Sequence, residues 1–155
     1  VDDEKLIRQS NINLIKKYFH KKEVNLLICE CEDGFDCLDI IYKSKKIGLE
    51  FNYIITDQTM NYICGSVLAE IILLLKAKGV IKEINMYLLT SYSTKIIKNE
   101  SNFIDIFSKP LAKRHLESIF GHLDEEEEVE EYEGEFEEDE ENENEDENEN
   151  KNKEM

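Results

Sequence analysis

The sequence lacks the features that mark several large classes of protein. Its four cysteines include no CxxC pair, which excludes a zinc site of the usual spacing. Its longest apolar stretch, Val67–Leu75, is interrupted by Glu70 and is well short of the roughly 20 residues that a membrane-spanning helix needs. The chain has no excess of positive charge, which argues against a nucleic-acid-binding protein.

The chain also lacks a secretory signal and a starting methionine. It opens with Val1 and a run of charged residues, so we expect an intracellular, reducing setting on the cytoplasmic side. Because the first residue is not methionine, we interpret the chain as a piece of a longer protein, which could itself be anchored in a membrane.

The net charge of -17 is concentrated at one end of the chain. Residues 124–155 hold 20 acidic residues and two lysines, whereas residues 1–123 hold 16 acidic and 17 basic residues. The tail has too few apolar residues to offset the entropy of ordering, so we expect it to be disordered. It would serve either as a solubilising segment or as a docking segment for a basic partner.

Residues 1–123 are long enough for one domain with one core and alternate between two hydrophobic periods. Short apolar runs typical of buried parallel strands are Val24–Cys31, Tyr53–Thr56, Ile84–Thr90 and Phe103–Phe107. Helical spacing is found over Glu4–Phe19, Phe35–Lys45, Ser66–Lys78 and Lys113–Leu123. Gly79 is expected to end the third helix. This alternation predicts an α/β fold with a doubly wound parallel sheet.

Polar residues follow the predicted strands. They lie at the carboxyl ends of the strands, which is where the functional sites of such folds are found. They are Asp2 and Asp3 after Val1, Asp57 after Thr56, Thr90 with Ser91, and Lys109. Each has an ordinary explanation, such as a helix cap, a turn or a solvated strand end. Together, clustered carboxylates favour Mg²⁺, and an amine with a hydroxyl suits phosphoryl oxygens. An aspartate between them could act as a nucleophile and form an aspartyl phosphate.

The ordered motifs VDDE (1–4), IITD (54–57), Met60, Gly65, LLTS (88–91) and SKP (108–110) resemble the receiver domain of two-component response regulators and hybrid sensor kinases. The resemblance covers residues 1–123. It implies a flavodoxin-like (βα)₅ fold with strand order 2-1-3-4-5. Since the acidic pair ends strand 1 in that family, Val1 would be the last residue of a strand that is otherwise missing.

The resemblance also implies a role for each site residue. Asp57 would accept a phosphoryl group from a phosphohistidine on a histidine kinase or a histidine phosphotransfer protein. Asp3 would bind Mg²⁺ directly and Asp2 mostly through water. Asp57 and the backbone carbonyl of Thr59 would complete the metal's protein ligands.

Two further residues would handle the phosphoryl group itself. Lys109 would pair with its oxygens, next to a cis peptide bond to Pro110. Thr90 would move to hydrogen-bond the group, which is the switch, and the small Ser91 would leave the pocket open. The protein would then be a phosphoacceptor switch and not an enzyme with a separate substrate.

The sequence departs from the family pattern in three places. Asn61 stands where a proline usually follows Met60, and Ile106 stands where an aromatic residue is common. The stretch from Thr90 to Lys109 is short, so the helix within it should be stubby or irregular. These departures motivate a rival hypothesis, a pseudo-receiver that keeps the fold without switching.

Other functions and other residues carry weaker signals. A second rival is a protein whose acidic tail does the work by binding basic proteins. A haloacid-dehalogenase-type phosphatase needs a second acid two residues after Asp57. Thr59 stands there, so the sequence excludes this class of phosphatase. The absence of an output domain after residue 123 favours a hybrid histidine kinase as the parent protein, ahead of a stand-alone receiver. We expect the histidines to lie on the surface and Cys29, Cys31 and Cys37 to be buried small residues.

Overall fold

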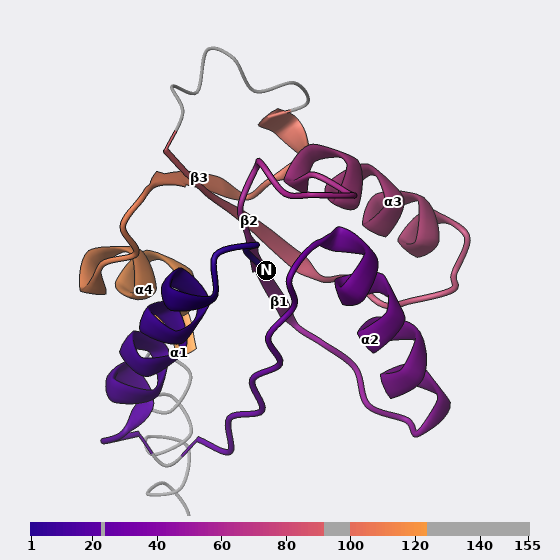
Figure 1. Cartoon of the computed structure of the whole chain (residues 1–155). Coiled ribbons are helices and arrows are strands. Elements are labelled where there is room, and N and C mark those ends of the chain that lie inside the picture. Colours follow the sequence, from indigo (N-terminus) through magenta and orange to yellow (C-terminus); the bar gives the residue numbers. More distant parts are fainter. Residues whose placement is uncertain (23, 92–99, 124–155) are drawn as a thin grey trace, which may run out of the picture. The chain divides into compact units, whose positions relative to one another are not determined.

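The computed structural model describes residues 1–22, 24–91 and 100–123. Its sheet has three parallel strands in the order β1-β2-β3 (Figure 1). They are β1 (Tyr53–Thr56), β2 (Asn85–Thr90) and β3 (Asp105–Ser108). The register places Thr56 opposite Leu88 and Thr90 opposite Ser108. The carboxyl ends of the three strands therefore lie at one edge, as the sequence predicts.

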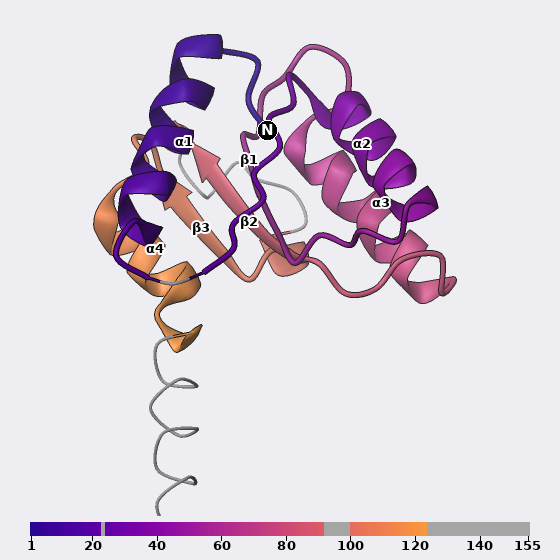
Figure 2. The same cartoon turned by 90° about the horizontal axis from the view of Figure 1, so that it is seen from below.

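Helices cover both faces of this sheet. They are α1 (Lys5–Phe19), α2 (Gly34–Lys46), α3 (Gly65–Ala77) and α4 (Lys113–Phe120). One face carries α1 and α4, and the other carries α2 and α3 (Figure 2). This two-sided covering confirms the doubly wound parallel architecture and explains why the strands read as nearly continuous apolar runs.

The strand predicted over Val24–Cys31 is not formed. The chain between α1 and α2 contains no strand among its described residues, although its apolar pattern predicts one. A strand needs successive hydrogen bonds to a neighbour. Beside this segment, the Asp2 amide donates one such bond to the Cys31 carbonyl at 3.1 Å. One bond at the end of the run does not hold a ladder.

Val1 occupies the place of a strand residue beside β1. Its amino group donates to the Ile55 carbonyl at 2.7 Å, and the Asp57 amide donates to the Val1 carbonyl at 2.9 Å. The start of the chain therefore lies between β1 and the segment that ends at Cys31. This placement carries Asp2 and Asp3 to the edge where the strands end.

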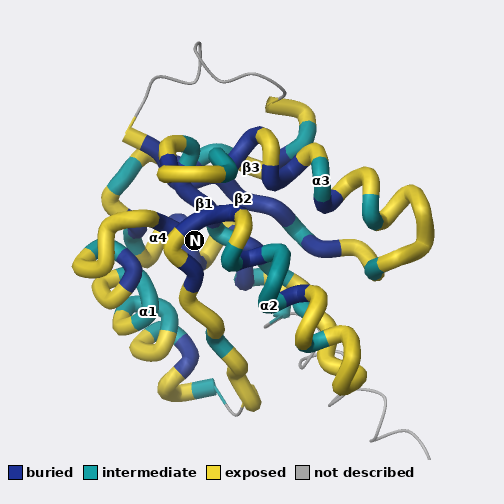
Figure 3. The backbone as a smooth tube through the Cα atoms, turned by 45° about the vertical axis from the view of Figure 1, so that its right-hand side comes forward, coloured by how far each residue is buried: buried dark blue, intermediate teal, exposed yellow. Residues whose placement is uncertain are grey.

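The core lies on both sides of the sheet, and β2 forms the most buried strand (Figure 3). Fully buried side chains include Leu68 and Ile72 from α3, Leu88 and Leu89 from β2, and Leu116 from α4. Burying a side chain of this size stabilises a fold by roughly 1.5–3 kcal/mol. β2 is the central strand, and its six residues are almost entirely buried.

Specific residues begin and end two of these helices. At the start of α2, Asp33 Oδ1 accepts from the amides of Phe35 at 2.7 Å and Asp36 at 3.1 Å. At the end of α3, Gly79 has a φ of 66°, and the Val80 amide reaches back to the Leu75 carbonyl at 2.9 Å. The predicted stop at Gly79 is thereby confirmed, because glycine tolerates this conformation best.

The last predicted strand begins later than its pattern suggests. A short 3₁₀ helix, Glu100–Asn102, precedes it, and the Phe103 amide donates to the Glu100 carbonyl. Phe103 is buried in the core without belonging to β3. Most of the stretch in which the irregular helix is expected, residues 92–99, lies outside the described residues.

Two other expectations concern the ends of the chain and the membrane. The predicted disordered tail, residues 124–155, also lies outside the described residues. Within the described ranges, no helix has the length and apolar character needed to cross a membrane.

Candidate functional site

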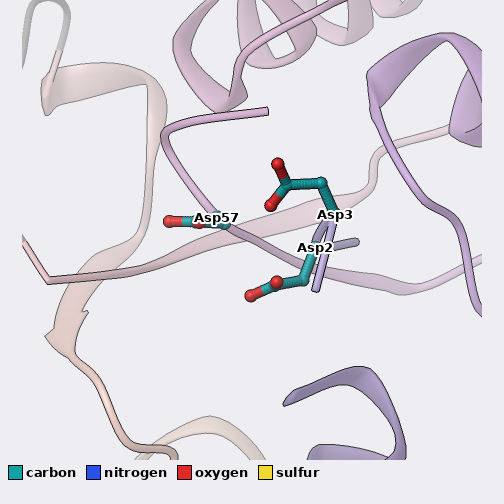
Figure 4. Close-up of side chains that lie close together, drawn as sticks. All are labelled: Asp2, Asp3 and Asp57. Carbon is teal, nitrogen blue, oxygen red and sulfur yellow. The ribbon is translucent and has the colours of Figure 1, made fainter. Parts of the chain in front are cut away.

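Three carboxylates converge at the edge where the strands end (Figure 4). Asp57 directly follows β1, while Asp2 and Asp3 directly precede Glu4, the N-cap residue of α1. One oxygen from each of the three lies within 4.8 Å of the others. Asp2 and Asp57 are buried and Asp3 is exposed, so the cluster is open to solvent on the Asp3 side.

An ammonium group lies between two of these carboxylates. Lys109 Nζ is 2.6 Å from Asp2 Oδ2 and 2.9 Å from Asp57 Oδ2. Burial alone would lower the pKa of Lys109, but the hydrogen bonds to Asp2 and Asp57 outweigh burial and raise this pKa above its ordinary value. Lys109 is therefore a permanent cation at neutral pH and offsets part of the negative charge of the cluster.

The main chain fixes the position of Asp57. Its Oδ1 accepts from the Gln58 amide at 2.7 Å, which leaves Oδ2 facing Lys109. Its own amide is bonded to Val1, and Gly65 packs against its carbonyl oxygen. The carboxylate thus has one oxygen held by the backbone and one oxygen paired with a cation.

The remaining predicted residues surround this group. Thr90 ends β2 and is buried, and its carbonyl accepts from the Lys109 amide at 2.9 Å. Ser91 is exposed, and so is Thr59, two residues after Asp57. The Lys109–Pro110 peptide bond is cis, as the resemblance predicts. All the predicted site residues therefore stand at the same edge of the sheet or in the loops that follow it.

The carboxylate cluster suits a hard divalent cation. Its donors are carboxylate oxygens, and the single Lys109 ammonium leaves a net negative charge beside the exposed Asp3. Mg²⁺ prefers oxygen ligands and keeps several of its waters, so an open cluster with few protein ligands fits it. Asp2, Asp3 and Asp57 could hold the ion, with the Thr59 carbonyl as the fourth candidate.

Sequence reasoning missed two residues beside the site. Arg8, on α1, is buried and donates from Nη1 to the Asp2 carbonyl at 2.7 Å. Ser66, at the start of α3, donates to Gln58 Oε1 at 2.9 Å, next to Asp57. Arg8 lies in the first turn of α1, five residues after Asp3. The hydrophobic pattern of this helix does not indicate that a charged residue is buried there.

Two other expectations need correction. His115 was expected on the surface but is buried, because its ring stacks on Phe107 at 4.7 Å between centroids. Cys29 was expected to be buried but is exposed, because its segment forms no strand against the sheet. Cys31 and Cys37 are buried, as predicted, and belong to the core cluster.

Comparisons with known proteins agree with this geometry at the level of the fold. No family model matches the chain, and no curated protein matches it. The chain is similar in structure to a two-component response regulator from Cytophaga hutchinsonii, at 18% identity over 80% of this chain and 92% of that chain, with a TM-score of 0.61. It is also similar to the receiver domain of the Francisella response regulator 1452, at 23% identity over 81% and 93% of the two chains, with a TM-score of 0.55.

A third similar structure is a CheY-like response regulator receiver domain protein from Methanospirillum hungatei JF-1. It is 19% identical over 79% of this chain and 88% of that chain, with a TM-score of 0.54. The chain has the receiver fold. In that fold, β1, β2 and β3 take the places of strands 3, 4 and 5, which are neighbours in the order 2-1-3-4-5. Val1 stands where strand 1 ends, and Cys31 stands where strand 2 ends.

Within the receiver fold, the predicted site residues occupy a consistent set of places. Asp57 follows strand 3, Thr90 ends strand 4, and Lys109 follows strand 5. Ile106, at the position that is often aromatic, is partly buried and packs against the core. The receiver fold thus accounts for the convergence of carboxylates, hydroxyl and ammonium at one edge.

Proposed function

We propose that this chain is a phosphorelay receiver whose Asp57 accepts a phosphoryl group. The observation that carries the proposal is the Lys109 ammonium, bonded to both Asp57 and Asp2 within a cluster of three carboxylates. A largely buried lysine that pairs two acids at the strand ends suits a site that must accept the three oxygens of a phosphoryl group.

The chemistry would be a displacement at phosphorus. Asp57 Oδ attacks the phosphorus of a phosphohistidine, a new P–O bond forms, and the P–N bond breaks with the electron pair returning to the imidazole. Bound Mg²⁺, held by Asp2, Asp3, Asp57 and the Thr59 carbonyl, would neutralise charge on the transferred group. Lys109 would pair with one phosphoryl oxygen and Thr90 would donate to another.

Phosphorylation would also change the partners of Lys109. In the unmodified chain, Lys109 contacts Asp57 Oδ2 directly. A phosphoryl group on Asp57 would place new anionic oxygens at this contact and draw in the hydroxyl of Thr90, whose strand is hydrogen-bonded to β3. The response would be read on the face built from β3 and its flanking helices.

The experiment is phosphorylation of the full chain with Mg²⁺ and a small phosphoryl donor, followed by intact mass. We expect one added phosphoryl group, which requires Mg²⁺ and is absent in Asp57→Asn. A matched control is Asp105→Asn, which removes an exposed carboxylate at the opposite end of β3. Equal labelling of the parent and Asp57→Asn would sink the proposal.

The physiological setting extends the same proposal. The donor would be a histidine kinase or a histidine phosphotransfer protein, on the cytoplasmic side, with no contact to nucleic acid. The parent would be a hybrid histidine kinase, with residues 1–123 as its receiver domain. Residues 124–155 would form a separate segment that recruits a basic partner. Deleting that segment should leave phosphorylation intact and abolish binding to a basic protein, which should be steeply salt-dependent beforehand.

One observation favours a second candidate, a pseudo-receiver. Ile106 is partly buried against the core at the position where an aromatic residue usually moves with the threonine. A receiver that does not switch would show unchanged amide NMR spectra under phosphorylating conditions. Shifts at Thr90, Ser91 and β3 on phosphorylation would favour the switching receiver.

A further inference from the structure

Arg8 is the only described arginine that is buried, and its side chain joins three parts of the chain. It lies on α1 and is 7% exposed. Its Nη1 donates to the Asp2 carbonyl at 2.7 Å, and its Nη2 donates to Glu32 Oε1 at 3.3 Å. Its Nε lies 3.6 Å from Glu30 Oε2. A buried charge with this many specific contacts is costly unless those contacts are maintained.

The contact with Asp2 completes the backbone bonding of that residue. The Asp2 amide donates to Cys31, and the Asp2 carbonyl accepts from Arg8. With both backbone groups held, the side chain has a fixed origin. Its Oδ1 accepts from the Glu4 amide at 2.9 Å, and its Oδ2 pairs with Lys109. Arg8 is therefore one bond away from the residue that shares Lys109 with Asp57.

The contacts with Glu30 and Glu32 attach the neighbouring segment to α1. This segment forms no strand within the described residues, so few backbone bonds hold it beside Asp2. Both glutamates are at least half exposed, and the guanidinium they contact is buried. The Arg8 side chain thus holds the segment of Glu30 and Glu32 in place, as the backbone hydrogen bonds of a strand would otherwise do.

The guanidinium retains one unused donor. Arg8 Nε is buried and makes no hydrogen bond among the described residues. Arg8 also lines an open cavity of about 370 Å³, together with Glu30, Glu32, Asp36, Asp39 and Ile40. Glu30 has room there to close the 3.6 Å separation to Nε.

We propose that Arg8 is a positioning residue for the carboxylate cluster: it fixes Asp2 through the Asp2 carbonyl, and so sets the geometry in which Lys109 and Mg²⁺ share the three carboxylates. This inference rests on the proposed function, because it concerns the same metal-dependent site. Arg8 itself touches none of the reacting atoms. Residues that orient metal ligands in this way commonly affect metal affinity by about tenfold or more.

The test is Mg²⁺ binding to the full chain by titration calorimetry, with phosphoryl labelling as a second readout. The variants are Arg8→Lys, which keeps the charge but loses the planar fork, and Arg8→Gln, which keeps a donor without charge. We expect each variant to bind Mg²⁺ about tenfold more weakly and to regain full labelling at high Mg²⁺. We also expect the Asp2 and Lys109 amide resonances to shift in the Mg²⁺-free state.

A destabilised control separates positioning from general loss of stability. Gly79→Ala strains the end of α3, where φ is +66° and nothing lies within 4 Å of the new Cβ. If Gly79→Ala and Arg8→Lys weaken Mg²⁺ binding equally at matched stability, Arg8 is merely structural and the proposal is overturned. Parent-like Mg²⁺ binding in both Arg8 variants would also overturn it.

The proposed function can fail separately. A parent chain that neither binds Mg²⁺ nor accepts a phosphoryl group would overturn the proposed function and, with it, the positioning role. A parent that does both, together with unaffected Arg8 variants, would overturn the positioning role alone. If an Arg8 variant is too unstable to titrate, Glu30→Gln with Glu32→Gln weakens the same anchor from its exposed side, and parent-like Mg²⁺ binding there would contradict the proposal.

Discussion

Gly65 lies so close to Asp57 that a side chain at position 65 would collide with the main chain of the phosphoacceptor candidate. A Cβ built on Gly65 would be 2.4 Å from the Asp57 carbonyl oxygen and 2.9 Å from Leu88 Cδ1. The first is a backbone atom directly after β1, and the second belongs to a fully buried side chain of β2, so neither can move cheaply. The start of α3 thus fixes the position of the Asp57 backbone at the edge of the sheet.

Gly65→Ala should therefore displace Asp57. We expect the free energy of unfolding to fall by roughly 1–3 kcal/mol, as for overpacked cores, with slower phosphorylation of Asp57. Chemical denaturation and labelling kinetics measure the two effects. Gly79→Ala serves as the control, because it should cost about 1 kcal/mol through its positive φ and leave labelling unchanged. Parent-like labelling of Gly65→Ala would contradict this account.

Lys109→Met should make the chain more dependent on Mg²⁺. Without Lys109, Asp2 and Asp57 lose the cation that separates them, so the metal-free variant should be less stable by on the order of 3 kcal/mol. Mg²⁺ should then raise the melting temperature of the variant more than that of the parent. Thermal unfolding with and without Mg²⁺ tests this. The control is Lys113→Met, which removes an exposed lysine paired with Glu117.

His115 should make the stability of the protein depend on pH. Burial lowers its pKa, Arg114 lowers it further, and Asp105 acts in the opposite direction. The Ala112 amide donates to Nδ1 at 3.2 Å, and the cationic Arg114 guanidinium places its Nε 3.2 Å from Nε2. The folded protein therefore resists protonation at this ring.

The unfolded chain takes up that proton at an ordinary pKa of about 6.5. Stability should thus decline as the pH falls through this value, by at most about 1.4 kcal/mol per pH unit, and level off below the lowered pKa of the folded state. Denaturation curves from pH 8 to pH 5 measure the slope. His115→Gln should remove this component, and His20→Gln, at an exposed histidine, should leave it in place.

Asp33→Ala should weaken the start of α2. Asp33 Oδ1 accepts two amide hydrogen bonds there, and its removal should lower the free energy of unfolding by about 1 kcal/mol. Asp33→Asn keeps an acceptor oxygen and should restore most of that loss. Urea denaturation of the three proteins gives the comparison, and an Asp33→Ala chain as stable as the parent would show that α2 is held by packing alone.

The sequence predicts the sheet well where each strand has a regular neighbour. The ranges expected for β1 and β2 agree with the structure within one residue, and the acidic pair, Asp57, Thr90 and Lys109 converge as expected. The run 24–31 was predicted wrongly, because apolar pattern reports burial preference and cannot report whether a hydrogen-bonding partner is present. Arg8 and His115 were missed because the burial of a charged or titratable side chain depends on its tertiary contacts.

The two sides of the carboxylate cluster differ in mechanical stiffness. Asp57 directly follows β1, which is paired along its length with β2. Asp2 belongs to the start of the chain, which is joined to β1 and Asp57 by the two hydrogen bonds of Val1. The Asp2 backbone makes one further hydrogen bond to Cys31 and one to Arg8. The Asp57 side is therefore the more tightly held, and a change in the distance between Asp2 and Asp57 would come mainly from movement of Asp2. A cation bound between them would restrain the distance between Asp2 and Asp57. The segment that leads to Cys31 would be the first to change position, because few hydrogen bonds hold it.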